Sequence, residues 1–312
     1  MIPTLPAKSD VAARVLRPAR AKNTRASTQF DTALGWRPGF GAAAVLRFVL
    51  CVVVLFIFAA PFVTIVSGAF DANTDSTRVS LFPNEPSLLP FQVATSKGIW
   101  GYFLNSLVIV GGGLLLQITI SVLTSYALAR HKFRGQSIVL LLFLLTMMLP
   151  EEVIAIPLAQ IIGDLPVVGI SLRGTVFGVI LPVAVWGFSI LVMTEFMKDI
   201  PHEIEEAARL DGVGELRMLW SIILPLCKPV LGVATIFGFM MIWDQYLLPL
   251  IAANDPSDYT LTVALSILRV DAQVGPGVLL AGALLALIPS LIVYLLMQKS
   301  LITGITSGAT KG

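Results

Sequence analysis

The chain has 312 residues, of which 56% are hydrophobic and only 13% carry a charge. A soluble domain carries about 25% charged residues, so the composition excludes an ordinary soluble protein and predicts one polytopic membrane domain. The net charge is only +2, and the basic residues are scattered over loops and do not form a stripe with aromatic residues. No nucleic-acid partner is therefore predicted. The cysteines (Cys51 and Cys227) and histidines (His131 and His202) share no ligand spacing, so neither a disulfide framework nor a metal site is expected.

Residues 1–43 are rich in Pro, Ala and Arg and contain seven Lys or Arg residues against two acids. We predict that this segment is a disordered, basic extension on the cytoplasmic side, held near an anionic membrane surface. A nucleic-acid-binding arm is the alternative interpretation of the same charges. Residues 44–312 are predicted to form the transmembrane domain.

Apolar stretches predict six membrane-spanning helices. A helix rises about 1.5 Å per residue, so about 20 apolar residues cross a bilayer core of about 30 Å. The predicted spans cover approximately residues 46–70, 99–129, 137–162, 174–196, 219–250 and 278–299. We expect the third span to kink at Pro150 and to continue beyond it. The fifth is interrupted by Pro225, Pro229, Asp244 and Pro249. The predicted fold class is therefore all-α integral membrane.

The distribution of Lys and Arg predicts the orientation of these spans. The side that holds both termini carries 17 of these residues, and the opposite side carries four. Basic residues are retained on the cytoplasmic side of a membrane. Both termini, and the loop between the fourth and fifth spans, are therefore predicted to be cytoplasmic.

The loop between the fourth and fifth spans is predicted to contain a short surface helix. Asp199 is its candidate N-cap, Pro201 suits its first turn, and acidic residues follow. Gly212 suits the left-handed position that ends a helix. A second helix is expected to begin at Glu215 and to enter the membrane.

The same loop contains Glu206-Ala207-Ala208, then Gly212, then Ile222 and Leu224-Pro225. This spacing resembles the EAA loop of the membrane subunits of ATP-binding-cassette importers. The resemblance implies a cytoplasmic coupling helix that docks into an ATPase subunit, where Glu206 pairs with a basic residue and the small side chains of Ala207 and Ala208 allow close approach. The implied coupling residues are Glu206, Ala207, Ala208, Asp211, Gly212, Leu224 and Pro225.

Two further stretches resemble the carbohydrate branch of this family, the six-helix partner of the maltose type. They are Tyr126-Ala127-Leu128-Ala129-Arg130 with Phe133 and Gly135, and the C-terminal run from Gln298 to Gly312. The resemblance covers about residues 45–312 and implies a sugar permease in a bacterial cytoplasmic membrane. The implied partners are a second, non-identical permease, two ATPase subunits that bind ATP and magnesium, an extracytoplasmic solute-binding protein and membrane lipid. The sequence has no G-x-x-x-x-G-K-[S/T] motif, so this chain is predicted to be no enzyme and to hold no cofactor.

Ionisable residues inside membrane spans usually face a cavity or a partner, because exposure to lipid is costly. Glu151, Glu152 and Asp244 interrupt the predicted spans, and Asp244 lies among aromatic and amide side chains suited to stack on a sugar and bond its hydroxyls. We predict a substrate path lined by Glu151, Trp243, Asp244, Gln245 and Tyr246. Two alternatives remain open: Glu151 and Glu152 are helix-end charges at the outer surface, and Asp244 is a buried structural hydrogen-bonding group.

The outer loop 251–278 resembles the family's loop that reaches toward the solute-binding protein, and an ordinary exposed loop is the alternative. Its candidate contact residues are Asp255, Pro256, Asp258 and Tyr259. If the fifth span is one helix, about 20 residues, or about 30 Å, connect the coupling loop to Asp244. That span would then be the mechanical link between them, and Pro229 is the position where it could bend instead of transmitting motion.

Two other functions remain open. A glycerol-phosphate-like solute would favour Arg or Lys along the path, and the span interiors lack them. A proton-coupled secondary transporter would use Glu151, Glu152 or Asp244 as proton carriers, and would act without ATP.

Overall fold

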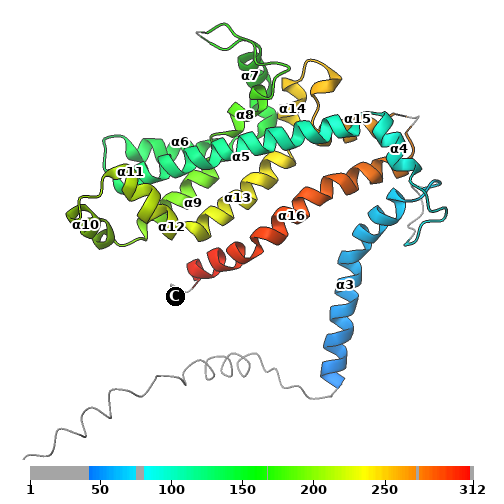
Figure 1. Cartoon of the computed structure of the whole chain (residues 1–312), viewed down its shortest axis with the longest axis horizontal. Coiled ribbons are helices and arrows are strands. Elements are labelled where there is room, and N and C mark those ends of the chain that lie inside the picture. Colours follow the sequence, from blue (N-terminus) through cyan, green and yellow to red (C-terminus); the bar gives the residue numbers. More distant parts are fainter. Residues whose placement is uncertain (1–41, 75–80, 167, 272–273, 310–312) are drawn as a thin grey trace, which may run out of the picture. The chain divides into compact units, whose positions relative to one another are not determined.

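The computed structural model describes residues 42–74, 81–166, 168–271 and 274–309, and its described secondary structure consists of helices without a β-strand (Figure 1). The predicted basic extension lies outside these residues except at its last two positions. The chain divides into two compact units between Ala60 and Pro61, and each is described by itself. In the first unit, the described residues belong to helix α3 (Ala42–Ala69), whose apolar side chains are largely exposed, as contact with lipid requires.

The prediction of an all-helical membrane protein is confirmed. Four stretches of the described chain are helices long and apolar enough to cross a membrane: Ala44–Ala69, Ile99–Arg130, Phe177–Lys198 and Pro276–Gln298. Two bent helix pairs raise the number of candidate spans to six if each pair is one span.

The second unit contains the remaining helices. In chain order they are α4 (Leu89–Ser96), α5 (Ile99–Arg130), α6 (Gln136–Met148), α7 (Glu151–Gly163), α8 (Phe177–Val183), α9 (Gly187–Lys198), α10 (His202–Leu210), α11 (Glu215–Met218), the π-helix η1 (Leu219–Ile223), α12 (Leu224–Leu226), α13 (Lys228–Trp243), α14 (Leu247–Ala252), the 3-10 helix η2 (Pro256–Asp258), α15 (Leu261–Leu268) and α16 (Pro276–Ala309).

The interruptions expected in the third and fifth spans are sharp bends. The chain direction changes by 106° between α6 and α7, and by 81° between the helical run Glu215–Leu226 and α13. The backbone is extended just before Pro150, as proline imposes on the residue that precedes it. The second break lies at Cys227, where Pro229 in the first turn of α13 has no N–H to continue the helical ladder. The chain breaks again at Asp244, so no single helix joins the predicted coupling loop to that residue.

Helix α5 is central to the second unit and contacts α8, α9, α13 and α15 (Figure 1). Buried polar side chains of α5 contribute to this packing. Gln117 Nε2 donates to the carbonyl of Val183 at 2.9 Å, and Ser125 Oγ donates to the carbonyl of Ile190 at 2.8 Å. Gly238 of α13 faces Gln117, and a Cβ at Gly238 would collide with the amide oxygen of that side chain. The two helices therefore approach closely where one of them has no side chain.

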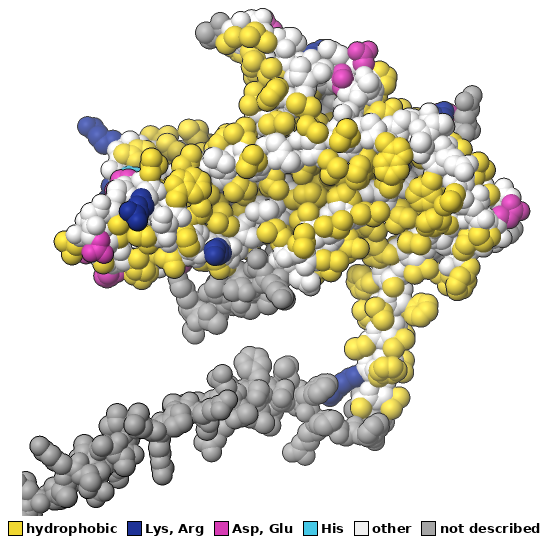
Figure 2. All heavy atoms as spheres, viewed as in Figure 1, with side chains coloured by type: hydrophobic (Ala, Val, Ile, Leu, Met, Phe, Trp, Pro, Cys, Tyr) yellow, Lys and Arg dark blue, Asp and Glu magenta, His cyan; other side chains and the backbone are white. Residues whose placement is uncertain are grey.

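Two buried apolar clusters lie along α5. The first cluster, around Ile109 and Trp243, joins α5 to α8, α13 and α14. The second cluster, around Tyr126 and Met193, joins the other half of α5 to α9 and to the segment from α10 to α13. Figure 2 shows that the middle of the second unit presents mainly hydrophobic side chains, whereas charged side chains gather toward the end that carries α10 and around the loops away from it. This distribution suits a body with a lipid-facing waist and polar ends.

The loop after α3 is organised by the buried carboxylate of Asp71. It accepts hydrogen bonds from the backbone N–H groups of Asn73 (3.1 Å), Asn84 (2.8 Å) and Glu85 (3.1 Å), and from the side-chain amide of Asn84 (3.2 Å). These bonds lower the pKa of Asp71, with the backbone N–H of Asn84 contributing most and burial opposing the shift. The ionised form of Asp71 therefore closes this loop.

Candidate functional site

Helix α10 lies at one end of α5 and forms the surface between the fourth and fifth spans (Figure 1). Its exposed residues include Glu206, Ala207 and Leu210, and the exposed residues Asp211 and Gly212 follow directly. We call these five residues the loop surface. Four of them are predicted coupling residues, and the helix and the turn that follows it expose them to solvent.

The other predicted coupling residues have different surroundings. Ala208 is 8% exposed and packs into the second apolar cluster, so it does not present its small side chain to a partner. Helical periodicity explains this difference, since residues 205 and 208 share one face of α10 and residues 206 and 207 lie off it. Leu224 is partly buried beside the same cluster, and Pro225 is exposed in α12.

A Schellman motif ends α10 at Gly212. Gly212 has φ +78°, and its N–H donates to the carbonyl of Arg209 at 3.0 Å. The N–H of Val213 donates to the carbonyl of Ala208, also at 3.0 Å, and Val213 packs against the second cluster. The predicted left-handed glycine is therefore confirmed, as is the start of the next helix at Glu215.

The predicted N-cap of α10 is wrong. The N-cap position is occupied by Pro201, and no side chain caps the helix. Asp199 is instead the C-cap residue of α9, three residues before the first residue of α10. Acidic residues in the first turn, Glu203 and Glu205, still suit the positive end of the helix dipole.

A network of charged and polar groups joins α10 to the end of α5. Glu205 forms an ion pair with Arg130, and the two side chains are only 3% and 1% exposed. Arg209 lies 3.2 Å from Glu215 and 3.8 Å from Glu205. Tyr126 Oη donates to Glu215 Oε2 at 2.7 Å. Sequence reasoning missed Glu205 and these contacts, although Tyr126 and Arg130 belong to a stretch that it singled out.

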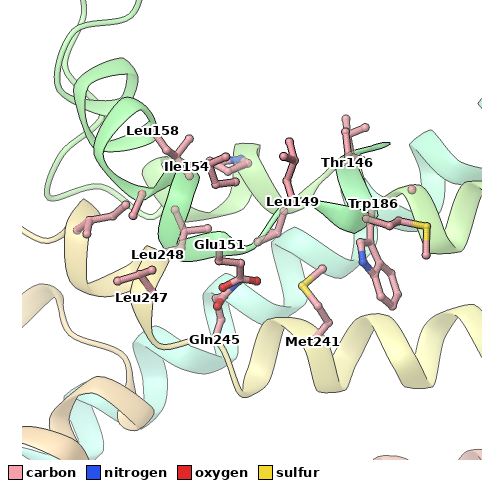
Figure 3. Close-up of a pocket in the computed structure, with 17 residues that line it drawn as sticks. Thr146, Leu149, Glu151, Ile154, Leu158, Trp186, Met241, Gln245, Leu247 and Leu248 are labelled. Carbon is pink, nitrogen blue, oxygen red and sulfur yellow. The ribbon is translucent and has the colours of Figure 1, made fainter. Parts of the chain in front are cut away.

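A second polar feature, away from α10, is a cavity of about 370 Å³ lined by residues of α6 to α9, α13 and α14. Figure 3 shows Glu151 at the start of α7 and Gln245 after α13 pointing toward each other, and Gln245 Nε2 donates to Glu151 Oε1 at 3.3 Å. Trp186 and Met241 line the same cavity, where the break between α8 and α9 places the indole. The cavity therefore combines a carboxylate, an amide and an aromatic ring.

The structure brings two of the five predicted path residues to this cavity and leaves three outside it. Trp243 is buried in the first apolar cluster, where it stacks on Phe239 with a centroid distance of 5.6 Å and donates its indole N–H to the carbonyl of Ala286 at 3.2 Å. Asp244, the C-cap residue of α13, and Tyr246 are exposed and do not line the cavity.

The outer loop contains the four residues predicted to contact a binding protein. Asp258 turns its carboxylate inward, and Oδ2 accepts the backbone N–H groups of Asn254 and Asp255, each at 3.0 Å. Asp255 and Pro256 are exposed at the start of η2, and Tyr259 is partly buried. Asn105 Nδ2 of α5 donates to the carbonyls of Ser257 and Tyr259 at 2.8 and 3.1 Å, so this loop is attached to α5.

One site residue, Trp186, has a signal in the sequence that the motif-based prediction did not use. Leu210 is 90% exposed but has no such signal, because single exposed apolar residues are common on protein surfaces. Trp186 follows the proline-containing segment Leu181–Ala184, and a broken helix inside a membrane usually lines protein or a cavity.

Comparison with known proteins gives a consistent similarity. Residues 117–301 match the family described as "Binding-protein-dependent transport system inner membrane component". The arabinooligosaccharides transport system permease protein AraQ of Bacillus subtilis is 30% identical over 275 residues, which are 86% of this chain and 95% of AraQ. The maltodextrin transport system permease protein MdxG of the same organism is 34% identical over 68% of this chain and 75% of its own.

A third relative is the diacetylchitobiose uptake system permease protein DasC of Streptomyces coelicolor, which is 30% identical over 74% of this chain and 83% of its own. Among solved structures, a chain of a bacterial ABC transporter involved in the import of the acidic polysaccharide alginate is similar, with a TM-score of 0.72. That likeness covers 84% of this chain and 99% of the other at 23% identity, and concerns the fold alone.

Proposed function

The chain belongs to the family of binding-protein-dependent transport system inner membrane components, and we propose that it conducts a neutral sugar or oligosaccharide in an ATP-driven importer. It is a multi-pass inner-membrane permease subunit of an ATP-binding-cassette transporter complex, and it is not itself the ATPase. In the proposed complex it joins a second, non-identical permease, two ATPase subunits that bind ATP and magnesium, and an extracytoplasmic solute-binding protein.

In this proposal, both termini and α10 are cytoplasmic, as the positions of Lys and Arg favour. The loop surface docks into an ATPase subunit. Closure of the two ATPase subunits on ATP moves the docked helices together and opens the cavity outward, where the binding protein releases its solute. Hydrolysis resets the inward-facing state, so the cycle alternates between two conformations that ATP and solute favour differently.

The residues that line the cavity support a neutral sugar as the transported solute. Glu151 and Gln245 offer an acceptor and a donor to hydroxyl groups, and Trp186 offers an aromatic face to the apolar side of a sugar ring. No Lys or Arg is among its described lining residues, whereas a phosphate or an acidic saccharide would favour such a partner. The names of the three relatives refer to oligosaccharides of the same chemical class.

Docking is tested by Glu206→Lys, which reverses the charge of an exposed residue of the loop surface. We expect the variant to insert normally and to lose the co-purifying ATPase subunits, because a repulsive charge replaces an attractive one. Glu195→Lys is the matched control, since Glu195 is an exposed acid near the end of α9 and outside the loop surface. Equal recovery of the ATPase subunits with both variants would refute the docking role.

The solute is tested by Glu151→Gln, with Glu152→Gln as the control, since Glu152 is adjacent, exposed and outside the cavity lining. In the reconstituted transporter, Glu151→Gln should weaken the apparent affinity for the transported oligosaccharide by about tenfold or more, because a hydrogen bond to a charged group contributes about 1.5–3 kcal/mol. Equal behaviour of the two variants would remove the cavity from the path. If the transporter took up glycerol phosphate and no neutral sugar, the sugar assignment would be overturned. If a proton gradient drove uptake in the absence of ATP, the importer mechanism would be overturned.

A further inference from the structure

Two side chains at the end of α5 hold the coupling loop on both sides of its hinge. Tyr126 and Arg130 are four residues apart, so they lie one above the other on one face of the helix. Arg130 pairs with Glu205 of α10, before Gly212. Tyr126 Oη donates to Glu215 at 2.7 Å, where α11 begins after Gly212. One face of α5 therefore determines where both arms of the loop lie.

The Arg130–Glu205 pair is buried, and it is joined to the backbone as well. The two side chains are 1% and 3% exposed, and Arg130 Nη2 donates to the carbonyl of Ile200 at 3.1 Å, just before α10. Separating two buried charges leaves each without a partner in an apolar environment, which is strongly unfavourable. A displacement of α10 must therefore either carry the end of α5 with it or break this pair.

The covalent route from the loop into the membrane is less direct. The chain that follows Gly212 passes through a π-helical turn, Leu219–Ile223, and then bends by 81° at Cys227. A push along α11 therefore does not act along the axis of α13. Helix α5, in contrast, is one unbroken helix of 32 residues, which corresponds to a length of about 48 Å.

The opposite end of α5 is attached to the outer loop. Asn105 Nδ2 donates to the carbonyls of Ser257 and Tyr259 at 2.8 and 3.1 Å, and Ser106 Oγ accepts the backbone N–H of Leu261 at 2.8 Å. Asn105 and Ser106 thus connect α5 to the loop that was predicted to contact a solute-binding protein. Specific polar contacts join each end of one helix to a different functional surface.

We propose that α5 is the element that transmits motion between the loop surface and the outer loop, with Arg130 and Glu205 as the positioning residues that attach it to α10. This inference rests on the proposed function, because only a chain docked to an ATPase has such motion to transmit. It replaces the expectation that the fifth span provides the link. The signal from a loaded binding protein reaches the ATPase subunits through α5 and the buried ion pair.

The test uses the whole complex in lipid nanodiscs, with its ATPase subunits and binding protein. The variants are Glu205→Gln, Arg130→Met, the apolar double variant Arg130→Met with Glu205→Leu, and the charge exchange Arg130→Glu with Glu205→Arg. Glu195→Gln is the control, because it breaks an exposed ion pair, Glu195 to Lys198 at 2.8 Å, on the neighbouring helix. Two quantities are measured: recovery of the ATPase subunits, and the ratio of ATP hydrolysis with and without loaded binding protein.

We expect the apolar double variant to recover the ATPase subunits normally, since it leaves no buried charge unpaired. Its stimulation ratio should fall by about tenfold, within the usual range of coupling between two sites, about 5–150-fold. The single variants should show the same loss, and the charge exchange should regain part of the stimulation. The control should stay within about twofold, as surface substitutions usually do.

Normal stimulation in an assembled apolar double variant would overturn the inference. Loss of ATPase recovery in that variant would also overturn it, since the pair would then only shape the docking surface. Failure of the wild-type chain to recover any ATPase subunit would refute the proposed function instead, and the variants cannot produce that result.

Discussion

The substitution Gly212→Ala tests how strictly the shape of the coupling loop depends on one residue. Gly212 has φ +78°, in the left-handed region, and an added Cβ would meet no atom within 4 Å. The substitution therefore changes the backbone preference without introducing a clash. Gly214 is the matched control, because it has φ −74° in extended backbone and equally open surroundings.

The left-handed conformation costs an L-residue about 1–2 kcal/mol. If the substituted alanine adopted another backbone conformation instead, the free-energy cost would be similar. The turn would then lose the hydrogen bonds from the N–H groups of residues 212 and 213 to the end of α10. Each of these contributes about 0.5–1.5 kcal/mol. Gly212→Ala should therefore disfavour the docking-competent loop by about 1–2 kcal/mol, which lowers the ratio of competent to other loop conformations by a factor of about 5–30. Gly214→Ala should change it little, and Gly212→Asn should fall between them, since asparagine tolerates the left-handed region.

The assay is titration of the permease in nanodiscs with isolated ATPase subunits. The apparent Kd should rise for Gly212→Ala by up to about 5–30-fold, because only the correctly shaped fraction of the loop binds, and the full factor is reached when that fraction is the minor one. Hydrogen exchange of residues 202–214 should increase in parallel. If Gly212→Ala and Gly214→Ala bind the ATPase subunits equally well, the Schellman motif is not what sets the loop surface, and the reasoning fails.

Three further predictions concern other parts of the chain. Gly238→Ala should lower the midpoint of thermal unfolding, because its Cβ meets the buried side chain of Gln117 and overpacking costs about 1–3 kcal/mol. Gly111→Ala on α5 is the control and should leave the midpoint unchanged, because an added Cβ there meets no atom within 4 Å. Leu210→Ser should weaken ATPase binding by up to about 1.5–3 kcal/mol if docking buries this exposed side chain, while chain insertion measured by membrane extraction stays normal. The loop held by Asp71 should become sensitive to protease as the pH falls: hydrogen bonding lowers the pKa of this carboxyl, so its stabilisation is present above the unfolded value of about 3.9 and is lost as the pH falls through the lower folded value. Asp71→Asn should be cleaved at neutral pH as well.

Local chemistry made part of the fold predictable from the sequence. The position of Gly212 could be predicted because a helix end needs a left-handed residue whatever surrounds it. The helices themselves follow from long apolar stretches. Pro150 and Pro229 marked where the third and fifth spans could bend, but the size of each bend was not predicted. Proline is tolerated within membrane helices, so its presence does not determine whether a span kinks slightly or turns by 106° or 81°.

The candidate site was less predictable, because it depends on which way each helix face points. Trp243 stood among polar neighbours and suggested a sugar contact, but it lies one turn after Phe239 and faces the core with that ring. Glu151 and Gln245 are 94 residues apart and meet only because the chain bends after Leu149. Such a meeting is a tertiary property, and periodicity in either segment alone does not contain it.

The stretch from Tyr126 to Arg130, first noticed as a family resemblance, has a physical role in this structure. Its two polar side chains bind acids that flank the hinge at Gly212, one on α10 and one at the start of α11. A hinge held from one side can still swing, whereas a hinge held on both sides by one helix face moves with that helix. The exposed Glu206 is therefore suited to contact a partner. The buried Glu205 beside it determines which part of this chain moves when the partner displaces α10. In the proposed mechanism, Glu206 therefore serves recognition of the ATPase subunit and Glu205 serves transmission of motion, on one short helix.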